Sequence, residues 1–147
     1  MTEPLSHVIR AFEASDWPFV CNAWMVQARK EPSLKFVSND VYFTRQRELV
    51  ESLVKTEMTL LAVDTSDTTH TYGFITYSVP NIVHWVYVKS VFWGMGIGGS
   101  LLSAATVDGP VLATHATERA FGLLRRSVAR RGISFDPYLL ARFVPTR

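Results

Sequence analysis

The sequence predicts an α+β (mixed α/β) fold, in which about four helices flank a central, mostly antiparallel sheet. Runs of β-branched and aromatic residues alternate with segments of helical periodicity, without a repeat or a low-complexity tract. Three consecutive strand-like runs indicate antiparallel neighbours, whereas the later runs are separated by helical segments and indicate crossovers. A length of 147 residues and a hydrophobic fraction of 48% predict a single domain, residues 1–147.

The first elements are expected to be a strand and two helices. Residues 7–14 alternate well enough for a strand. Asp16 can cap a helix over about 17–29. Asp40 can cap a second helix over about 41–56, because its apolar positions keep a helical period.

The middle of the chain predicts three strands followed by a helix. Residues 58–64 and 72–79 flank the polar turn TSDTTH and are expected to form a hairpin. Residues 82–89 are rich in β-branched and aromatic side chains, which favours a third strand. A glycine-rich segment follows this strand at once, and a helix over about 98–106 begins within it.

The last third of the chain predicts a strand, a helix and a final strand. The turn Asp-Gly-Pro precedes a short strand at 111–115. A helix is expected over 117–131, ended by Gly132 as the residue after the C-cap. Residues 133–144 are expected to include one last strand, around 138–143.

Composition excludes several classes of function. The single cysteine, Cys21, permits no intrachain disulfide, which favours a reducing compartment, and it is expected to be buried. The N-terminal residues do not resemble a signal peptide, and no apolar run reaches the roughly 18 residues of a membrane span. A net charge of +2 gives no general argument for nucleic acid. We therefore expect a cytoplasmic protein with neither a membrane nor a nucleic-acid partner, and we predict no metal site.

The segment VFWGMGIGGSLL, residues 91–102, carries the strongest functional signal. Four glycines fall within six positions between a strand and a helix; residues 93–99 are called the glycine loop below. The first amides of a helix, and those of a glycine turn, have no internal partner and bind anions. Because glycine has no side chain, a pyrophosphate can come close to this backbone. The segment therefore predicts a phosphate site.

Two common phosphate motifs fit this segment only in part. Gly94-x-Gly96-x-x-Gly99 matches the dinucleotide fingerprint, but only 48 residues follow Gly99. The acidic residue about 20 positions on, Glu118, begins a helix instead of ending a strand. The spacing of Gly94 and Gly99 also fits a P-loop, but Ser100 follows directly and the lysine is absent.

The longer run VYVKSVFWGMGIGGSLL, residues 86–102, resembles motif A of the GCN5-related N-acetyltransferase (GNAT) superfamily. That motif is an apolar strand, then [Q/R]-x-x-G-x-[G/A], then a helix opening with Leu-Leu. The order of elements matches the family over nearly the whole chain. The resemblance implies a V-shaped splay in the sheet and acetyl-CoA as cosubstrate, with its pyrophosphate on the loop amides. The implied cofactor-binding residues are Val86, Tyr87, Val88, Trp93, Gly94, Met95, Gly96, Ile97, Gly98, Gly99 and Ser100.

The resemblance also implies an acetyl-CoA-dependent N-acetyltransferase that acts on an amine of a small molecule or a protein. Such a reaction needs a base for the ammonium proton. His84 lies on the strand before the glycine loop, where family bases often sit; a hydrogen-bonded sheet histidine is the alternative. His115 ends the next strand and is a candidate base or substrate contact. Tyr138 is a candidate acid, or else a packing aromatic.

Two positions differ from the family pattern. Trp93 stands where the motif has Arg or Gln, and Leu124 stands where many members carry a tyrosine acid. They favour a second hypothesis, a catalytically degenerate GNAT-fold protein with a binding or structural role. The ending FDPYLL loosely resembles acetyltransferase-like proteins encoded by phages, so this role extends to a phage particle, and the location to host cytoplasm or virion. Either hypothesis leaves a homodimer or a larger protein assembly open.

Overall fold

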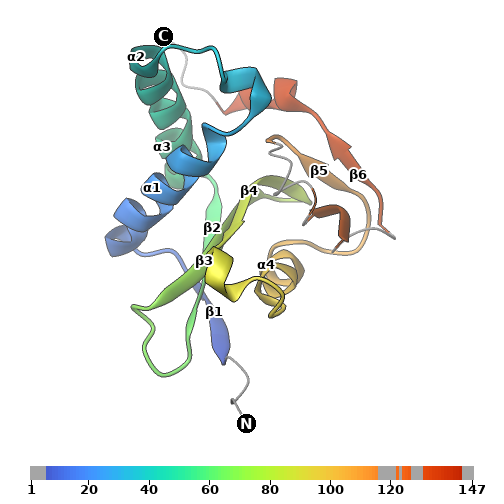
Figure 1. Ribbon diagram of the computed structural model, residues 1–147. Helices are drawn as coiled ribbons and strands as arrows, with labels where there is room; N and C mark the ends of the chain where they lie inside the picture. Colours follow the sequence, from blue (N-terminus) through green and yellow to red (C-terminus); the bar gives the residue numbers. More distant parts are fainter. Residues whose placement is uncertain (1–5, 116–121, 123, 127–130, 144–147) are drawn as a thin grey trace.

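A six-stranded sheet lies at the centre of the fold, and the computed structural model describes residues 6–115, 122, 124–126 and 131–143. The strands follow their sequence order across the sheet (Figure 1): β1 (His7–Ala11), β2 (Met58–Asp64), β3 (Thr71–Ser78), β4 (Ile82–Val88), β5 (Val111–Ala113) and β6 (Ile133–Phe135). The first four strands pair antiparallel, and the β4–β5 and β5–β6 pairs are parallel. The prediction of a mixed α/β fold with a mostly antiparallel sheet is confirmed.

Helices cover both faces of this sheet (Figure 1). On one face lie α1 (Trp17–Ala28) and α3 (Arg47–Thr56), and on the other lies α4 (Ile97–Ala105). The short helix α2 (Asn39–Val41) continues through a π-helical turn (Tyr42–Gln46) into α3, so the second predicted helix is one continuous unit. Short 3-10 turns occur at Ala14–Asp16, Pro32–Leu34, Ser90–Phe92 and Pro137–Arg142.

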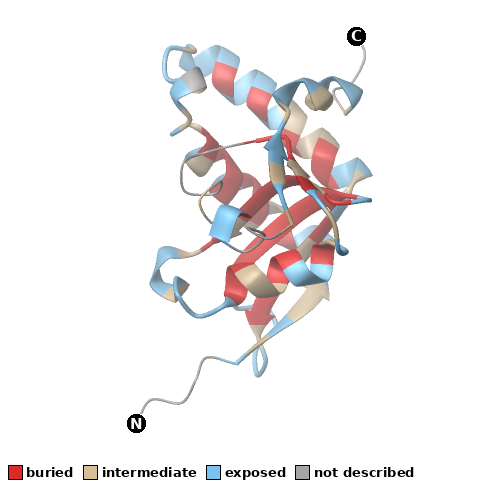
Figure 2. Cartoon of the chain, turned by 90° about the vertical axis from the view of Figure 1, so that its right-hand side faces the viewer, coloured by how far each residue is buried: buried red, intermediate tan, exposed pale blue. Residues whose placement is uncertain are grey.

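Each face of the sheet has its own apolar core. Figure 2 shows the buried residues in red along the sheet and on the helices that cover it. On β4, Val86 and Val88 pack toward α4, whereas Trp85 and Tyr87 pack toward α1 and α3. This alternation follows from the period of two along a strand and explains why β4 reads as a continuous apolar run. Cys21 lies in the core under α1, as the sequence predicts.

Strands β4 and β5 separate soon after they meet. Their register joins Ile82 to Leu112 and Val83 to Ala113, and one further hydrogen bond runs from the Thr114 amide to the Val83 carbonyl, 3.1 Å. β4 continues to Val88, so its last residues have no β5 partner within the described part of the sheet. This opening, on the side where β4 leads into the glycine loop, is the predicted V-shaped splay.

Both predicted helix caps differ in the structure. Asp16 occupies the N-cap position of α1, but its carboxylate binds Arg10 instead of an amide of the helix. A long-range ion pair thus replaces the local cap that the sequence predicted. The second helix begins two residues earlier than expected, because Ser38 rather than Asp40 accepts the capping hydrogen bond.

The last strand expected within 133–144 is present, but its predicted position around 138–143 is wrong. The final strand is β6, Ile133–Phe135, and Pro137–Arg142 forms a 3-10 turn. The carboxylate of Asp136 accepts a hydrogen bond from the Tyr138 amide, 3.0 Å. A proline in the first turn and an aspartate cap favour a helical turn over a strand.

The predicted helix at 117–131 falls largely outside the described residues. Its described positions 122 and 124–126 are helical, and Leu124 is 2% exposed in the core under α4. Over the described ranges, the structure has no helix with the length and apolar character of a membrane span.

Candidate functional site

The glycine loop is shaped by two residues in the left-handed conformation. Gly94 has φ +82° and Gly96 has φ +81°, values that side-chain-bearing residues rarely adopt. A Cβ atom built at either position would meet nothing within 4 Å. The backbone conformation therefore requires these glycines, and the space beside them is open.

Helix α4 begins within this loop, with Gly96 as its N-cap. Its first helical hydrogen bond runs from the Ser100 amide to the Gly96 carbonyl, 3.0 Å. The amides of Ile97, Gly98 and Gly99 precede that bond, so helix geometry gives them no acceptor in α4. The partial positive charge at the start of this nine-residue helix adds to these donors. The arrangement can bind an anion such as a pyrophosphate.

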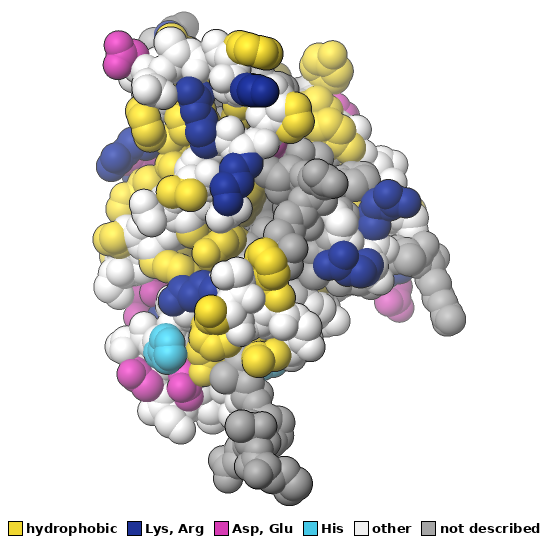
Figure 3. All heavy atoms as spheres, viewed as in Figure 1, with side chains coloured by type: hydrophobic (Ala, Val, Ile, Leu, Met, Phe, Trp, Pro, Cys, Tyr) yellow, Lys and Arg dark blue, Asp and Glu magenta, His cyan; other side chains and the backbone are white. Residues whose placement is uncertain are grey.

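Trp93 ties the loop to the end of β4. Its indole Nε1 donates to the carbonyl oxygen of Val88, 2.8 Å, and the residue is 45% exposed. Val91 and Met95 are also exposed, whereas Lys89 extends its ammonium over the Phe19 ring at 5.1 Å. Lysine and arginine side chains are spread over the face in Figure 3 and form no single patch there. Residues 93–99 contain no lysine or arginine, so the glycine loop itself offers a phosphate its backbone amides.

The strand residues predicted to bind the cofactor lie at the splay. Val86 and Val88 are buried toward α4, and Tyr87 is half-buried beside Phe19 and Phe74. Because β4 lies between β3 and β5, the backbone of these residues faces β3 on one side and the opening on the other. An extended ligand group would meet main-chain donors and acceptors there.

His84 lies at a β-bulge in β4. Tyr77 of β3 pairs with Val83 and Thr76 pairs with Trp85, so His84 is the extra residue between two pairs. Its side chain is 1% exposed. The bulge therefore places a polar ring inside the protein at the first residue of β4 after its last pair with β5.

Both ring nitrogens of His84 have partners. Nε2 lies 2.7 Å from the Ser78 hydroxyl, and Nδ1 lies 2.8 Å from the Thr114 hydroxyl. Burial lowers the pKa of His84 to about 4, against a smaller opposing effect of Glu57. The imidazole is therefore neutral at physiological pH.

His115 follows β5 and shares the Thr114 hydroxyl with His84. Its Nδ1 lies 3.2 Å from that hydroxyl, and the residue is 7% exposed. Its ring contacts Trp24 and Trp85 edge to face, with centroids 5.5 and 5.6 Å away. Burial lowers the pKa of His115 to about 3, with a lesser contribution in the same direction from the nearby His84 side chain. The backbone of His84 has a smaller effect in the opposite direction.

Three ring nitrogens of this cluster have no hydrogen-bond partner among the described residues. They are Nε2 of His115 and the indole Nε1 atoms of Trp24 and Trp85, all buried. A buried polar atom without a partner costs on the order of 1–3 kcal/mol. The cluster of touching rings therefore holds three polar atoms whose hydrogen-bonding capacity is unused among the described residues.

The structure brings two of the three predicted catalytic side chains together. His84 and His115 are linked through the Thr114 hydroxyl. Tyr138, in contrast, is 88% exposed on the last 3-10 turn, and its backbone amide donates to the carboxylate of Asp136. Within the described ranges, no three His, Cys, Asp or Glu side chains group as metal ligands do.

Sequence reasoning missed the partners Glu57, Ser78 and Thr114, because the network draws on α3, β3, β4 and β5 and has no spacing signature. The only local signal is a hydroxyl residue directly before His115.

Comparison with known proteins identifies the fold. No family model and no curated protein matches the sequence. A candidate acetyltransferase from Pyrococcus horikoshii shares 15% identity at a TM-score of 0.52, over 86% of this chain and 44% of that one. Apo YjaB from Escherichia coli shares 22% identity at a TM-score of 0.49, over 70% of this chain and 72% of that one. A GCN5-related N-acetyltransferase from Rhodopseudomonas palustris shares 16% identity at a TM-score of 0.43, over 71% of this chain and 66% of that one.

These similarities concern the fold. The chain spans less than half the length of the Pyrococcus horikoshii protein and just under two thirds of the Rhodopseudomonas palustris one. With its six-stranded sheet, its splay between β4 and β5 and the helix that starts in the glycine loop, the chain has the GNAT fold.

Proposed function

We propose that this chain is an acetyl-CoA-dependent N-acetyltransferase and a divergent member of the GNAT superfamily. The observation that carries the proposal is that one strand, β4, leads both to the splay and to the glycine loop. An anion-binding helix start and an opening lined by unpaired backbone thus lie next to each other. A pyrophosphate joined to a long thioester arm needs both features together.

In this proposal the coenzyme pyrophosphate binds the amides of the glycine loop and the acetyl thioester lies between β4 and β5. Gly94 and Gly96 support it, because their conformation turns the chain and leaves open space where a Cβ would stand. Backbone N–H groups of β4 at the splay can donate to the thioester oxygen, where negative charge develops.

The reaction transfers acetyl from sulfur to nitrogen. The amine lone pair forms the new N–C bond, the C–S bond breaks, the nitrogen loses one N–H proton, and the thiolate takes up one proton. An ammonium ion must lose a proton first, so the site needs a proton acceptor. The amine belongs to a small molecule or a protein, and the cluster of His115, Trp24 and Trp85 offers the unpartnered polar atoms that could meet it.

Calorimetry with acetyl-CoA and CoA tests the proposal, with a matched pair of glycine variants. Gly96 and Gly132 have nearly equal φ, +81° and +80°, and open space at Cβ, but only Gly96 lies in the glycine loop. We expect Gly96→Ala to weaken CoA binding about tenfold, and Gly132→Ala to leave it unchanged. No binding of either ligand at about millimolar concentration would contradict the proposal.

A second candidate is a GNAT-fold protein that binds a partner or serves a structural role, for example in a phage particle, without catalysis. Leu124 favours it, because this buried apolar position supplies no acid for the leaving thiolate. Trp93 favours it too, since its indole replaces a basic residue and binds the protein's own backbone. Purification with a larger assembly, and no acetyl transfer, would support this candidate over the first.

A further inference from the structure

Four consecutive hydrogen bonds join five side chains in one line across the sheet, here called the histidine relay. The line runs from Glu57 at the end of α3 through Ser78 and His84 to Thr114 and His115. Its heavy-atom distances are 2.6, 2.7, 2.8 and 3.2 Å in that order. Only Glu57 is half-buried; the other four members are buried.

The carboxylate at one end fixes the direction of the first bonds. An ionised carboxylate only accepts, so the Ser78 hydroxyl donates to Glu57. With its single proton used there, the Ser78 oxygen must accept from the N–H at Nε2 of His84. His84 is neutral, because burial lowers its pKa to about 4, and its Nδ1 therefore carries a lone pair.

The same reasoning assigns the other half of the relay. The Thr114 hydroxyl donates its proton to Nδ1 of His84, so its oxygen accepts from Nδ1–H of His115. His115 is neutral as well, which leaves the lone pair on Nε2. That nitrogen is the atom without a partner among the described residues. The relay thus begins at a half-buried carboxylate and ends at a free, buried base.

The free end lies next to the splay. His115 is two residues beyond the last residue of β5 that pairs with β4, and Trp85 of β4 and Trp24 of α1 contact its ring. An acceptor amine must approach a thioester held between these two strands. The lone pair of His115 is therefore within the part of the molecule where the proposed reaction needs a base.

We propose that Nε2 of His115 takes the proton of the acceptor amine and that the relay delivers a proton to Glu57. This inference rests on the proposed function. Each relay proton moves by one bond: Nδ1–H of His115 goes to Thr114, the Thr114 proton to His84, the Nε2–H proton to Ser78, and the Ser78 proton to Glu57. The amine loses one proton, Glu57 gains one, and no group is oxidised or reduced.

A concerted shift matches the electrostatics of the site. Because burial lowers the pKa of His115 to about 3, an imidazolium there would be short-lived. Transfer through the line avoids that ion, since the added charge is neutralised at Glu57, which is exposed enough to release the proton to water. Ser78, His84 and Thr114 are positioning residues in this scheme, and His115 is the catalytic residue.

The first test reads the protonated nitrogens directly, without a ligand. Nitrogen-15 NMR of histidine-labelled protein should find His84 protonated at Nε2 and His115 protonated at Nδ1. Thr114→Val should abolish the preference at His115, and Thr114→Ser should restore it. A wild-type His115 that carries its proton on Nε2 would overturn the assignment, whether or not the protein binds acetyl-CoA.

The second test measures turnover as release of the CoA thiol from acetyl-CoA. Glu57→Gln keeps an acceptor oxygen for Ser78 but cannot store a proton, and Glu51→Gln on the same helix is the control. With benzylamine, an ammonium ion at neutral pH, we expect Glu57→Gln to lower kcat about 100-fold with KM for acetyl-CoA unchanged. With hydroxylamine, which is neutral at this pH, kcat of Glu57→Gln should fall far less.

The outcomes separate the two proposals. Equal losses for both amines, or unchanged kcat in Glu57→Gln, would overturn the relay and leave the proposed function standing. Failure to bind acetyl-CoA, or to acetylate either amine, would remove the proposed function and the relay's catalytic role with it, whatever the NMR result.

Discussion

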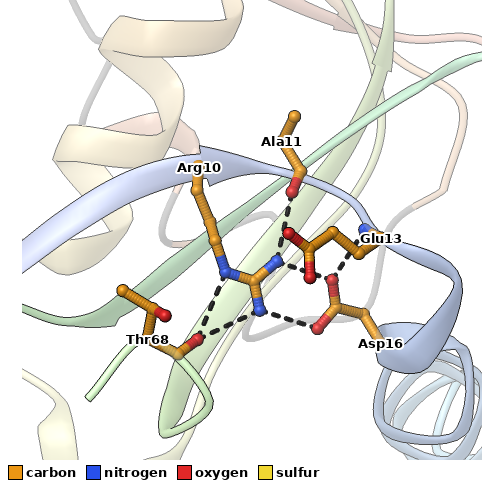
Figure 4. Close-up of polar contacts among 5 residues, drawn as sticks. All are labelled: Arg10, Ala11, Glu13, Asp16 and Thr68. Carbon is orange, nitrogen blue, oxygen red and sulfur yellow. Dashed lines mark hydrogen bonds and ion pairs between the residues drawn. The ribbon is translucent and has the colours of Figure 1, made fainter.

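Two polar networks among the described residues, each ending at or centred on a carboxylate, are built in opposite ways. In the first, called the Arg10 clamp, Arg10 forms a bidentate pair with Asp16 at 2.7 and 2.8 Å (Figure 4). Arg10 also donates to the carbonyls of Thr68 and Ala11, and Asp16 accepts from the Glu13 amide. Every nitrogen of this guanidinium has a partner. The histidine relay, in contrast, ends at an atom without one.

The two networks also differ in charge. Burial by itself would raise the pKa of Asp16, but the hydrogen bonds from Arg10 and from the Glu13 amide outweigh it and lower the pKa. The pKa of Arg10 is raised, chiefly by its hydrogen bond to Asp16. Burial outweighs the smaller opposing effects at the two histidines, whose pKa values fall to about 4 and about 3. The clamp is ionic and closed, and the relay is neutral in its interior and open at one end.

This difference indicates a difference in role. A closed ion pair that joins β1, the start of α1 and the β2–β3 turn can only stabilise the fold. An open line of directional hydrogen bonds stabilises the fold less, since it leaves a buried nitrogen unpaired, but it can receive a ligand. Loss of the clamp should therefore affect stability alone, and changes in the relay should affect both stability and activity.

The largest effect is expected at the clamp. Asp16→Ala removes a buried carboxylate and leaves the half-buried Arg10 guanidinium without its counter-ion, which should lower the free energy of unfolding by about 3 kcal/mol. Lys55→Ala removes an exposed pair with Glu51 at 3.4 Å and should cost less than about 0.5 kcal/mol. Urea unfolding of both variants measures the contrast. A loss below about 1 kcal/mol in Asp16→Ala would mean that the clamp is not structural.

A pH effect of similar size is expected from the relay. The folded-state pKa values of His84 and His115 lie below the unfolded value of about 6.5, so the unfolded chain binds protons that the native state refuses. Stability is fully present above about pH 6.5 and should fall by on the order of 3 kcal/mol, from the two histidines together, as the pH drops to about 5.5. Urea unfolding at a series of pH values measures this slope. Stability that stays constant over this window would show that the histidines titrate normally.

A smaller effect is expected where the relay is cut in its middle. Thr114→Val removes the hydroxyl between the two histidines and leaves a nitrogen of each unpaired, which should cost about 1–2 kcal/mol. Thr114→Ser keeps the hydroxyl and should cost less. Ser6→Ala, which breaks an exposed hydroxyl pair with Thr65 at 2.7 Å, is the control with almost no change. Thermal unfolding compares the three, and a loss in Thr114→Val no larger than in Ser6→Ala would argue against a relay.

The smallest effect is expected in the glycine loop, outside both networks. Gly96→Ala imposes a left-handed conformation on a residue with a side chain and should cost about 1 kcal/mol. Gly99→Ala lies in α4 with open space at Cβ and should be neutral or stabilising by a few tenths of a kcal/mol. Thermal unfolding of both variants checks this order, and equal melting temperatures would mean that the loop is not shaped as described.

The sequence predicted the elements whose signals are local. The strands were found because β2, β3 and β4 read as apolar runs between polar turns, and the glycine loop because its composition is unusual. Asp16 was misassigned because its local signal, a cap before Pro18, competes with a distant arginine that cannot be read from the sequence. The segment at 138–143 was misassigned because its apolar residues pack one side of a helical turn.

The candidate site was predicted only in part, for the same reason. His84 could be placed on the strand that leads to the glycine loop, and His115 at the end of the next strand. The hydrogen bonds that define their tautomers come from Glu57 and Ser78, which only the tertiary fold brings to them. The bulge at His84 is also a property of strand register and not of composition.

The central claim is that coenzyme binds at the glycine loop and the splay. One titration of nitrogen-15-labelled protein with acetyl-CoA, followed by backbone amide NMR, tests it most directly. We predict that the largest shifts fall on the amides of Gly94 and Gly96 to Ser100 and on the last residues of β4, while Arg10 and Asp16 in the clamp stay unchanged. Shifts absent at about millimolar ligand, or centred on the clamp, would contradict the account.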